Sequence, residues 1–322
     1  KEVIYFANTS SYYFNNWEYY QVDKEILEQN YSKVFISHDF IKTFFLIIKK
    51  PNADIFCWWW HTSFPIIFLS WLFRRNSFCT GAIHMFDYSK SPDYYKKNFI
   101  FRSLTNISLR LCKTNIFISK DQFLAITSHI NVTNPKVIYS SLGLKRSKFP
   151  ISKVDTTKYL DKNIIKLLFL GWLDYKQINR KSLLYTLKAV SICINEKNMN
   201  IQLTIAGKKG SGLEIIKEKI KQYKLTNFVQ IKTNIDAKDK NDLYLKSDLL
   251  VMPSHMEGFG NASLEAMSFG CPSIASRYGA SPEVIGESGF IINFINSKNI
   301  AKALVKYSNL SLRQKKQMRI KA

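Results

Sequence analysis

The feature that most constrains the fold is a regular alternation of apolar runs and helix-length segments between residues 163 and 293. Each run has the length of a strand and is almost continuously apolar, and most runs end at Gly or Ser. Such runs suit a parallel sheet with helices on both faces, because neither face of the strands then meets water. We therefore predict a doubly wound α/β domain with strands at residues 163–171, 201–207, 228–231, 248–254, 271–276 and 289–293.

The first half of the chain shows the same alternation with weaker punctuation. Its strand-like segments are residues 2–6, 33–37, 53–60, 79–84, 114–119 and 136–143. Residues 144–163 are polar and charged and lack an apolar period, which predicts a linker. The length of 322 residues also favours two domains. The predicted fold is α/β, with two Rossmann-like doubly wound domains facing a cleft, over residues 1–150 and 151–322.

The balance of charge is strongly positive. Lys and Arg number 47 against 24 Asp and Glu, a formal net charge of +23. Such an excess indicates an anionic ligand or surface, and nucleic acid and an anionic membrane are both compatible with it. The excess is spread over both halves and accompanies Lys-, Asn- and Ile-rich segments, so compositional bias explains it equally well. A nucleic-acid-binding protein is the alternative, disfavoured because no module with base-reading aromatic residues is recognisable.

Residues 55–73 form the most apolar stretch and are long enough to be weighed as a membrane span. His61 and Pro65 interrupt it, which predicts a buried strand before His61 and a short helix after Pro65. Residues 68–75 nevertheless place Trp and Phe beside two arginines, and residues 93–113 predict a basic helix with one apolar face. Together with the charge, these two segments predict peripheral association with an anionic membrane surface.

Five cysteines are scattered along the chain without a CxxC pair, which argues against a disulfide framework and against a zinc site. The chain enters a strand-like segment directly after Lys1, without the pattern of a signal peptide. We therefore expect a cytoplasmic protein, with attachment to the inner face of the cytoplasmic membrane as its peripheral form.

The best candidate for a ligand site follows the strand predicted at residues 248–254, since ligands of open α/β sheets bind at the carboxyl ends of strands. Gly260 and Asn261 open a predicted helix over residues 262–269, whose free N–H groups suit a diphosphate. Glu257 and Glu265 would lie beside that site. A single Glu near a helix N-terminus is also explained by the helix dipole, but the loop, spacing and glycines together favour a ligand site.

Residues 257–290 resemble the donor-site signature of family 4 retaining glycosyltransferases, which have the GT-B fold. Residues 169–182 and 203–212 resemble that family's phosphate-binding turn and the following glycine turn, and residues 80–87 resemble the strand that ends in its active-site His. The resemblance covers roughly residues 80–310. It implies transfer of a sugar from a nucleotide-sugar donor in the C-terminal domain to a hydroxyl acceptor in the N-terminal domain.

The resemblance also implies residue roles. Glu257 would accept hydrogen bonds from the donor sugar, Glu265 would hold the ribose hydroxyls, and His84 would lie near the reacting sugar. Positive charge and N–H donors are needed where the leaving diphosphate gains charge. The implied catalytic residues are His84, Glu257, Lys181 and Arg180, and the implied donor-binding residues are Gly258, Phe259, Gly260, Asn261, Ala262 and Glu265.

We expect no metal and no other cofactor, because the sequence lacks an Asp-x-Asp cluster and basic side chains can take the place of an ion. Trp172 stands where the family usually has Arg, and Arg180 is predicted to compensate. A non-catalytic sugar-nucleotide-binding protein is therefore a further alternative. The aromatic, basic N-terminal half predicts a lipid-linked saccharide as the acceptor, as in the assembly of surface polysaccharide, lipopolysaccharide or glycolipid.

Overall fold

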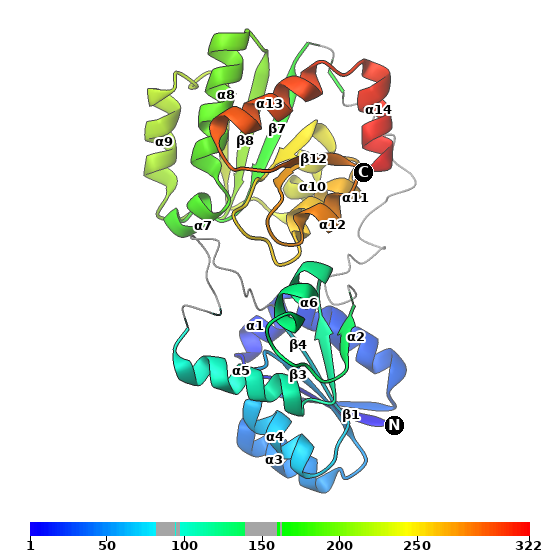
Figure 1. Ribbon diagram of the computed structural model, residues 1–322. Coiled ribbons are helices and arrows are strands. Elements are labelled where there is room, and N and C mark those ends of the chain that lie inside the picture. Colours follow the sequence, from blue (N-terminus) through cyan, green and yellow to red (C-terminus); the bar gives the residue numbers. More distant parts are fainter. Residues whose placement is uncertain (82–93, 95–96, 139–159, 162) are drawn as a thin grey trace. The chain divides into compact units, whose positions relative to one another are not determined.

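A computed structural model describes residues 1–81, 94, 97–138, 160–161 and 163–322 (Figure 1). The chain divides into two compact units, Lys1–Gly143 and Leu144–Ala322. The predicted boundary at residue 150 and most of the predicted linker lie outside the described residues. The cleft that we expect between the units stays a prediction.

The N-terminal unit is built on a sheet of six parallel strands in the order β2-β1-β3-β4-β5-β6. Each described strand overlaps one of the predicted segments, although β4 begins two residues and β6 one residue before the predicted start. Residues Val3–Ala7 are fully buried, which explains why the apolar run is continuous. The strands are β1 (Glu2–Ala7), β2 (Lys33–Ser37), β3 (Asp54–Trp58), β4 (Ser77–Gly81), β5 (Thr114–Phe117) and β6 (Pro135–Val137).

Helices cover both faces of this sheet. Alternate residues of β1 point to opposite faces, so Tyr5 packs with Phe14 and Tyr20 while Phe6 packs in a second cluster that includes Ile66. The first face carries α1 (Ser11–Asn16) and α2 (Glu18–Asn30). The second face carries α3 (Phe40–Lys49), α4 (Phe64–Leu72), α5 (Phe99–Leu111) and α6 (Lys120–Thr127).

The apolar stretch of residues 55–73 lies mostly on β3 and α4, as the two interruptions predict. Trp58 and Trp60 are buried, and the indole of Trp60 donates a hydrogen bond to Asn115 Oδ1 at 2.7 Å. Among the described residues, no helix is long and apolar enough to cross a membrane. The five cysteines are all free and buried.

The C-terminal unit contains a second parallel six-stranded sheet, in the order β12-β11-β10-β7-β8-β9. Strands β8 and β9 therefore extend the sheet on one side of β7, and β10, β11 and β12 extend it on the other side. The strands are β7 (Ile165–Leu170), β8 (Ile201–Gly207), β9 (Val229–Thr233), β10 (Leu249–Val251), β11 (Ser273–Ser276) and β12 (Gly289–Ile292).

The helices of this unit pack on its sheet around one large core, and α13 lies beside α8 (Figure 1). The helix predicted over residues 262–269 begins one residue earlier, at Asn261. The helices are α7 (Tyr175–Arg180), α8 (Leu183–Lys197), α9 (Leu213–Gln222), α10 (Ala237–Lys246), α11 (Asn261–Ser268), α12 (Ser281–Ile285), α13 (Ser297–Ser308) and α14 (Leu312–Lys321).

Candidate functional site

The candidate site lies at the carboxyl ends of β7 and β10, which are neighbours in the sheet. Strand order reverses between these two strands, and such switch points are the usual ligand sites of doubly wound sheets. Arg180 and Lys181 follow β7 through the short helix α7, and Glu257 follows β10. Residues 77 positions apart are thus brought together, as the distances below show.

Glu257 is held by partners from both sides of the switch point. Its Oε1 accepts hydrogen bonds from Arg180 Nη1 at 3.2 Å and from Ser254 Oγ at 2.7 Å. Its side chain is only 14% exposed. Burial alone would raise the pKa of Glu257, but the charges of Arg180 and Lys181 and the Ser254 hydrogen bond outweigh it and lower that pKa. Glu257 is therefore an ionised acceptor.

Lys181 lies across the end of β7. Its Nζ donates a hydrogen bond to the carbonyl oxygen of Leu170 at 3.1 Å and lies 3.3 Å from Met252 Sδ. The side chain packs closely on Gly171, since a Cβ there would lie 3.0 Å from Lys181 Cδ and Nζ. Burial lowers the pKa of Lys181, an effect that the carboxylates of Glu257 and Glu265 oppose. The ammonium group thus lies within electrostatic reach of both carboxylates.

The loop that carries Glu257 is hydrogen-bonded to the segment between β11 and α12. The backbone N–H of Ala280 donates to the Glu257 carbonyl oxygen at 3.0 Å. Gly279 has a φ of +70° and packs so closely that a Cβ would collide with the backbone of Glu257. A second tie joins Ser276 Oγ to the carbonyl oxygen of Ser254. The Glu257 carboxylate is therefore positioned by rigid backbone contacts, beyond its ion pair.

Gly260 caps helix α11 and has a φ of +96°, which a glycine adopts without strain. No side chain caps this helix N-terminus, and the space where a Gly260 Cβ would lie is open. Asn261 is exposed, while Gly258, Phe259 and Ala262 are partly buried. Backbone N–H groups at such a terminus suit an anionic group.

Glu265 has partners that our sequence reasoning missed. Its Oε2 accepts hydrogen bonds from Lys240 Nζ at 2.7 Å and from Tyr244 Oη at 3.1 Å. Lys240 and Tyr244 share one face of α10 because they are four residues apart, a spacing visible in the sequence. Nothing in the sequence, however, indicates that this face meets α11. Ser254 was also missed, although it lies only three residues before Glu257.

Trp172 follows β7 and is 57% exposed. The Nζ of Lys208 lies 5.0 Å from the centre of its ring, a cation–π contact between the loops after β7 and β8. Arg180, which we expect to replace the missing family Arg, instead binds Glu257 and donates to the Met256 carbonyl oxygen at 2.6 Å. Lys208 is thus an additional cation near the position of Trp172, and it was not singled out from the sequence.

His84, the predicted catalytic residue of the N-terminal unit, lies outside the described residues, so its predicted role stays a prediction.

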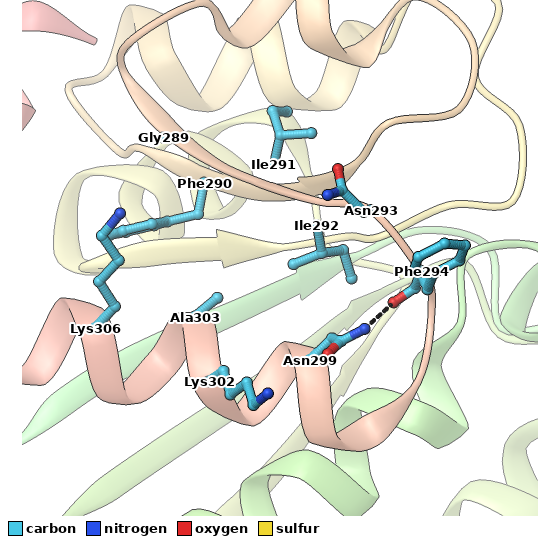
Figure 2. A pocket seen from close by; sticks show the side chains of 10 residues that line it. All are labelled: Gly289, Phe290, Ile291, Ile292, Asn293, Phe294, Asn299, Lys302, Ala303 and Lys306. Atoms are coloured by element: carbon cyan, nitrogen blue, oxygen red, sulfur yellow. Dashed lines mark hydrogen bonds between the residues drawn. The ribbon is translucent and has the colours of Figure 1, made fainter.

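A cavity of about 410 Å³ lies between β12 and α13, apart from the described site residues. Figure 2 shows its lining, in which Asn299 Nδ2 donates to the Phe294 carbonyl oxygen at 2.9 Å. None of the predicted site residues lines that cavity.

Comparison with known proteins finds a family model that matches the C-terminal unit. Residues 165–309 match the family model "Glycosyl transferases group 1". The chain is 23% identical over 226 residues to O-antigen chain mannosyltransferase B of Escherichia coli, covering 62% of this chain and 59% of that protein. It is 34% identical over 128 residues to poly(glycerol-phosphate) alpha-glucosyltransferase of Bacillus subtilis (strain 168), covering 39% and 18%. The chain thus spans less than two thirds of either relative.

Solved structures resemble the whole chain. Anabaena Alr3699/HepE in complex with UDP and glucose has a TM-score of 0.70 and 18% identity, covering 99% of this chain and 92% of that one. WaaG, a glycosyltransferase involved in lipopolysaccharide biosynthesis, has a TM-score of 0.69 and 12% identity, covering 99% and 94%. The chain therefore has two Rossmann-like units, the fold class of the GT-B glycosyltransferases, and its likeness to the group 1 glycosyltransferase family lies in the C-terminal unit.

Proposed function

We propose that this chain is a retaining, metal-independent glycosyltransferase that moves a sugar from a nucleotide-sugar donor to a hydroxyl acceptor. The observation that carries this proposal is the cluster of Glu257, Arg180 and Lys181 at the switch point between β7 and β10. An ionised acceptor beside two cations matches a donor that has both sugar hydroxyls and a diphosphate.

The transfer breaks the bond between the anomeric carbon and the diphosphate oxygen and forms a bond to the acceptor oxygen on the same face of the sugar. The proton of the acceptor hydroxyl passes to the leaving diphosphate in this step, so atoms and charge balance. The leaving diphosphate gains charge, and Lys181, Arg180 and the N–H groups at Gly260 and Asn261 would stabilise it. These cations also support the proposal that no metal ion is needed.

Glu257 would accept hydrogen bonds from hydroxyls of the donor sugar, and Glu265 would bind the ribose of the nucleotide. Lys240 and Tyr244 hold the Glu265 carboxylate in place, so ribose binding would use its remaining acceptor capacity. His84 remains the proposed catalytic group of the N-terminal unit.

The proposed acceptor is a lipid-linked saccharide in surface polysaccharide, lipopolysaccharide or glycolipid assembly. The names of relatives support this class of pathway, since they include the E. coli O-antigen mannosyltransferase and a capsular polysaccharide biosynthesis glycosyltransferase of Staphylococcus aureus. We also propose a cytoplasmic location, because the nucleotide-sugar donors of such an assembly pathway are used in the cytoplasm.

The first test is a thermal-shift panel of UDP, GDP, ADP, CMP and their common sugar conjugates, with a short DNA duplex as the control. We expect one nucleotide to stabilise the protein and the duplex to have no effect. Stabilisation by the duplex alone would contradict the donor site and favour the nucleic-acid alternative.

The second test measures transfer from the nucleotide sugar that the panel identifies. We expect Glu257→Gln to lower transfer about 10- to 100-fold and Lys181→Ala to abolish it, while thermal unfolding of both stays cooperative and EDTA leaves transfer unchanged. The anomeric configuration of the product, read by NMR, should equal that of the donor. Binding without any product would favour the non-catalytic alternative, and an inverted product would exclude a retaining mechanism.

A further inference from the structure

A second candidate site lies in the N-terminal unit, at the amino ends of β4 and β5. A cavity of about 610 Å³ is lined there by four cations, Arg74, Arg75, Arg110 and Lys113, and by the apolar side chains of Trp71 and Leu72. The predicted membrane segments 68–75 and 93–113 thus meet at their carboxyl ends. The cavity lies at the edge of the sheet opposite the carboxyl ends of these strands.

The four cations have no carboxylate partner in the part of the chain that the structure describes. Lys113 Nζ donates to Asn76 Oδ1, and Arg75 Nη2 donates to the Ile47 carbonyl oxygen at 3.4 Å. Arg75 Nε is buried without a hydrogen-bond partner. Arg110 lies in the last turn of α5, and Arg74 and Arg75 follow the end of α4, so both helix dipoles favour cations here; neither dipole supplies the four charges with an anionic partner.

Arg74 occupies a backbone conformation that usually selects glycine. Its φ is +54°, and the bonds from Arg74 N to Trp71 O and from Arg75 N to Ser70 O form a Schellman motif at the end of α4. A side chain in the left-handed region is less favourable than glycine. The chain therefore keeps a charged side chain at a position where glycine would favour the fold.

The surface beside the cavity is apolar. Phe68, Trp71, Leu72 and Phe73 are between 40% and 54% exposed at the end of α4. The neighbouring helix α3 exposes Ile41, Phe45 and Ile48, by 50% to 69%, at the i, i+4, i+7 spacing of one helix face. Helices α3 and α4 are in contact and lie side by side (Figure 1). Clusters of exposed apolar side chains mark interaction surfaces.

We propose that this basic–aromatic face, formed by the four cations of the cavity and the exposed apolar residues of α3 and α4, binds the surface of an anionic membrane. The cavity takes the phosphate of a lipid headgroup, and the aromatic and aliphatic side chains enter the boundary of the acyl chains. The exposed apolar side chains favour lipid over nucleic acid, because aliphatic residues such as Ile41 and Leu72 can be buried in the acyl region of a bilayer and gain little beside a sugar–phosphate backbone. This surface contains none of the residues proposed to act in sugar transfer, and so goes beyond the proposed function.

Vesicle flotation tests the charge requirement. The full chain is mixed with phosphatidylcholine vesicles that contain about 30% phosphatidylglycerol or none, at low and high salt. We expect flotation with the anionic vesicles at low salt only. Arg74→Gly should weaken partitioning about fivefold, the equivalent of about 1 kcal/mol for each cation near an anionic surface.

Lys224→Gly is the matched control. Lys224 has a φ of +55° and ends α9 with the same pair of backbone bonds, from Lys224 N to Lys221 O and from Leu225 N to Ile220 O. The two variants therefore lose the same charge and gain the same backbone freedom in different units. Equal weakening by both would overturn the proposal in favour of dispersed charge, and so would a lack of flotation with anionic vesicles at low salt.

A second pair of variants tests the apolar contact. Trp71→Gln should reduce flotation with anionic vesicles at low salt although it removes no charge, whereas Phe294→Gln, at an exposed aromatic residue of the other unit, should not. A short DNA duplex or inorganic phosphate that binds with the same dependence on Arg74, without flotation of the protein, would replace the membrane as the partner.

Discussion

The ionisation of Glu257 is the property of a single residue on which the proposed donor site depends. Its pKa lies below the ordinary value of 4.5 because cations and a hydroxyl donor outweigh its burial. The stabilisation from this carboxylate is therefore fully present above about pH 4.5 and is lost as pH falls through the lower pKa of the folded protein. The ionised Glu257 carboxylate thus contributes both to the stability of the fold above about pH 4.5 and to the proposed activity.

We predict that Glu257→Gln lowers kcat/KM by about 10- to 100-fold, since a hydrogen bond to a charged acceptor contributes about 1.5–3 kcal/mol. The variant should also have a lower free energy of unfolding than the native chain, and this difference should shrink as pH falls below about 4.5. Kinetics and urea unfolding across this pH range provide the measurement. Glu214→Gln, which removes an exposed carboxylate paired with Lys217, is the control and should keep full activity.

Gly279 supports Glu257 through its backbone. We predict that Gly279→Ala lowers both activity and thermal stability, because the added Cβ strains a positive φ and collides with the Glu257 backbone. Gly286→Ala, at the other end of α12, is the matched control, with a φ of +52° but open space around its Cβ position. It should lose stability by about 1–3 kcal/mol through backbone strain and keep its activity. Equal loss of activity in both variants would contradict the positioning role.

Residue identities in the site could be proposed from the sequence where a local motif contains them, as for Glu257 and Gly260. Lys240 and Tyr244 could not, because their contact with Glu265 joins two helices whose packing depends on the whole sheet. The role of Arg180 as a cation near the donor stays a prediction, and its bond to Glu257 is a tertiary contact that the sequence does not reveal.

At the scale of elements, a buried carboxyl group joins α2 to β3. Asp23 is 5% exposed and accepts a hydrogen bond from Trp58 Nε1 at 2.8 Å. Burial raises the pKa of Asp23 from 3.8 to about 7, although the Trp58 hydrogen bond opposes this effect. Between these two pH values the folded protein retains a proton that the unfolded chain has lost. The stability of the N-terminal unit should therefore fall as pH rises through this window.

We predict that Asp23→Asn removes this slope, which reaches at most about 1.4 kcal/mol per pH unit. The amide oxygen can still accept the Trp58 hydrogen bond, so packing should be retained. Urea unfolding monitored at the N-terminal unit between pH 4 and pH 7 is the measurement. If the stability of the variant still falls with pH as steeply as that of the native chain, a group other than Asp23 causes the change.

Strands were the elements best predicted from sequence, because an apolar run covered on both faces is a local signal. Their ends were less accurate: β10 spans only Leu249–Val251 of the predicted residues 248–254, and β9 continues to Thr233. Strand ends depend on the partner strand, since pairing stops where the neighbour ends. The pattern of one strand alone does not contain that information.

At the scale of the whole molecule, the two units have separate hydrophobic cores. We predict that the nucleotide found in the panel, at about 100 times its Kd, adds about 2.7 kcal/mol of stability to the C-terminal unit. Hydrogen exchange should show slower exchange in β7, β10 and α11 with the nucleotide bound. Lys181→Ala should abolish the effect, and protection confined to the N-terminal unit would contradict the proposed donor site.

The sequence by itself determined the fold class, the strands and the candidate donor loop, because apolar periodicity and glycine positions are local properties that survive in any tertiary context. Only the tertiary structure decided which side chains meet. The insertion of β10 beside β7 brings Glu257 to Arg180. The parallel pairing of β4 with β5 brings together Arg74, Arg75, Arg110 and Lys113 around one cavity. Such contacts depend on strand order, which is set by the free energy of packing the whole chain.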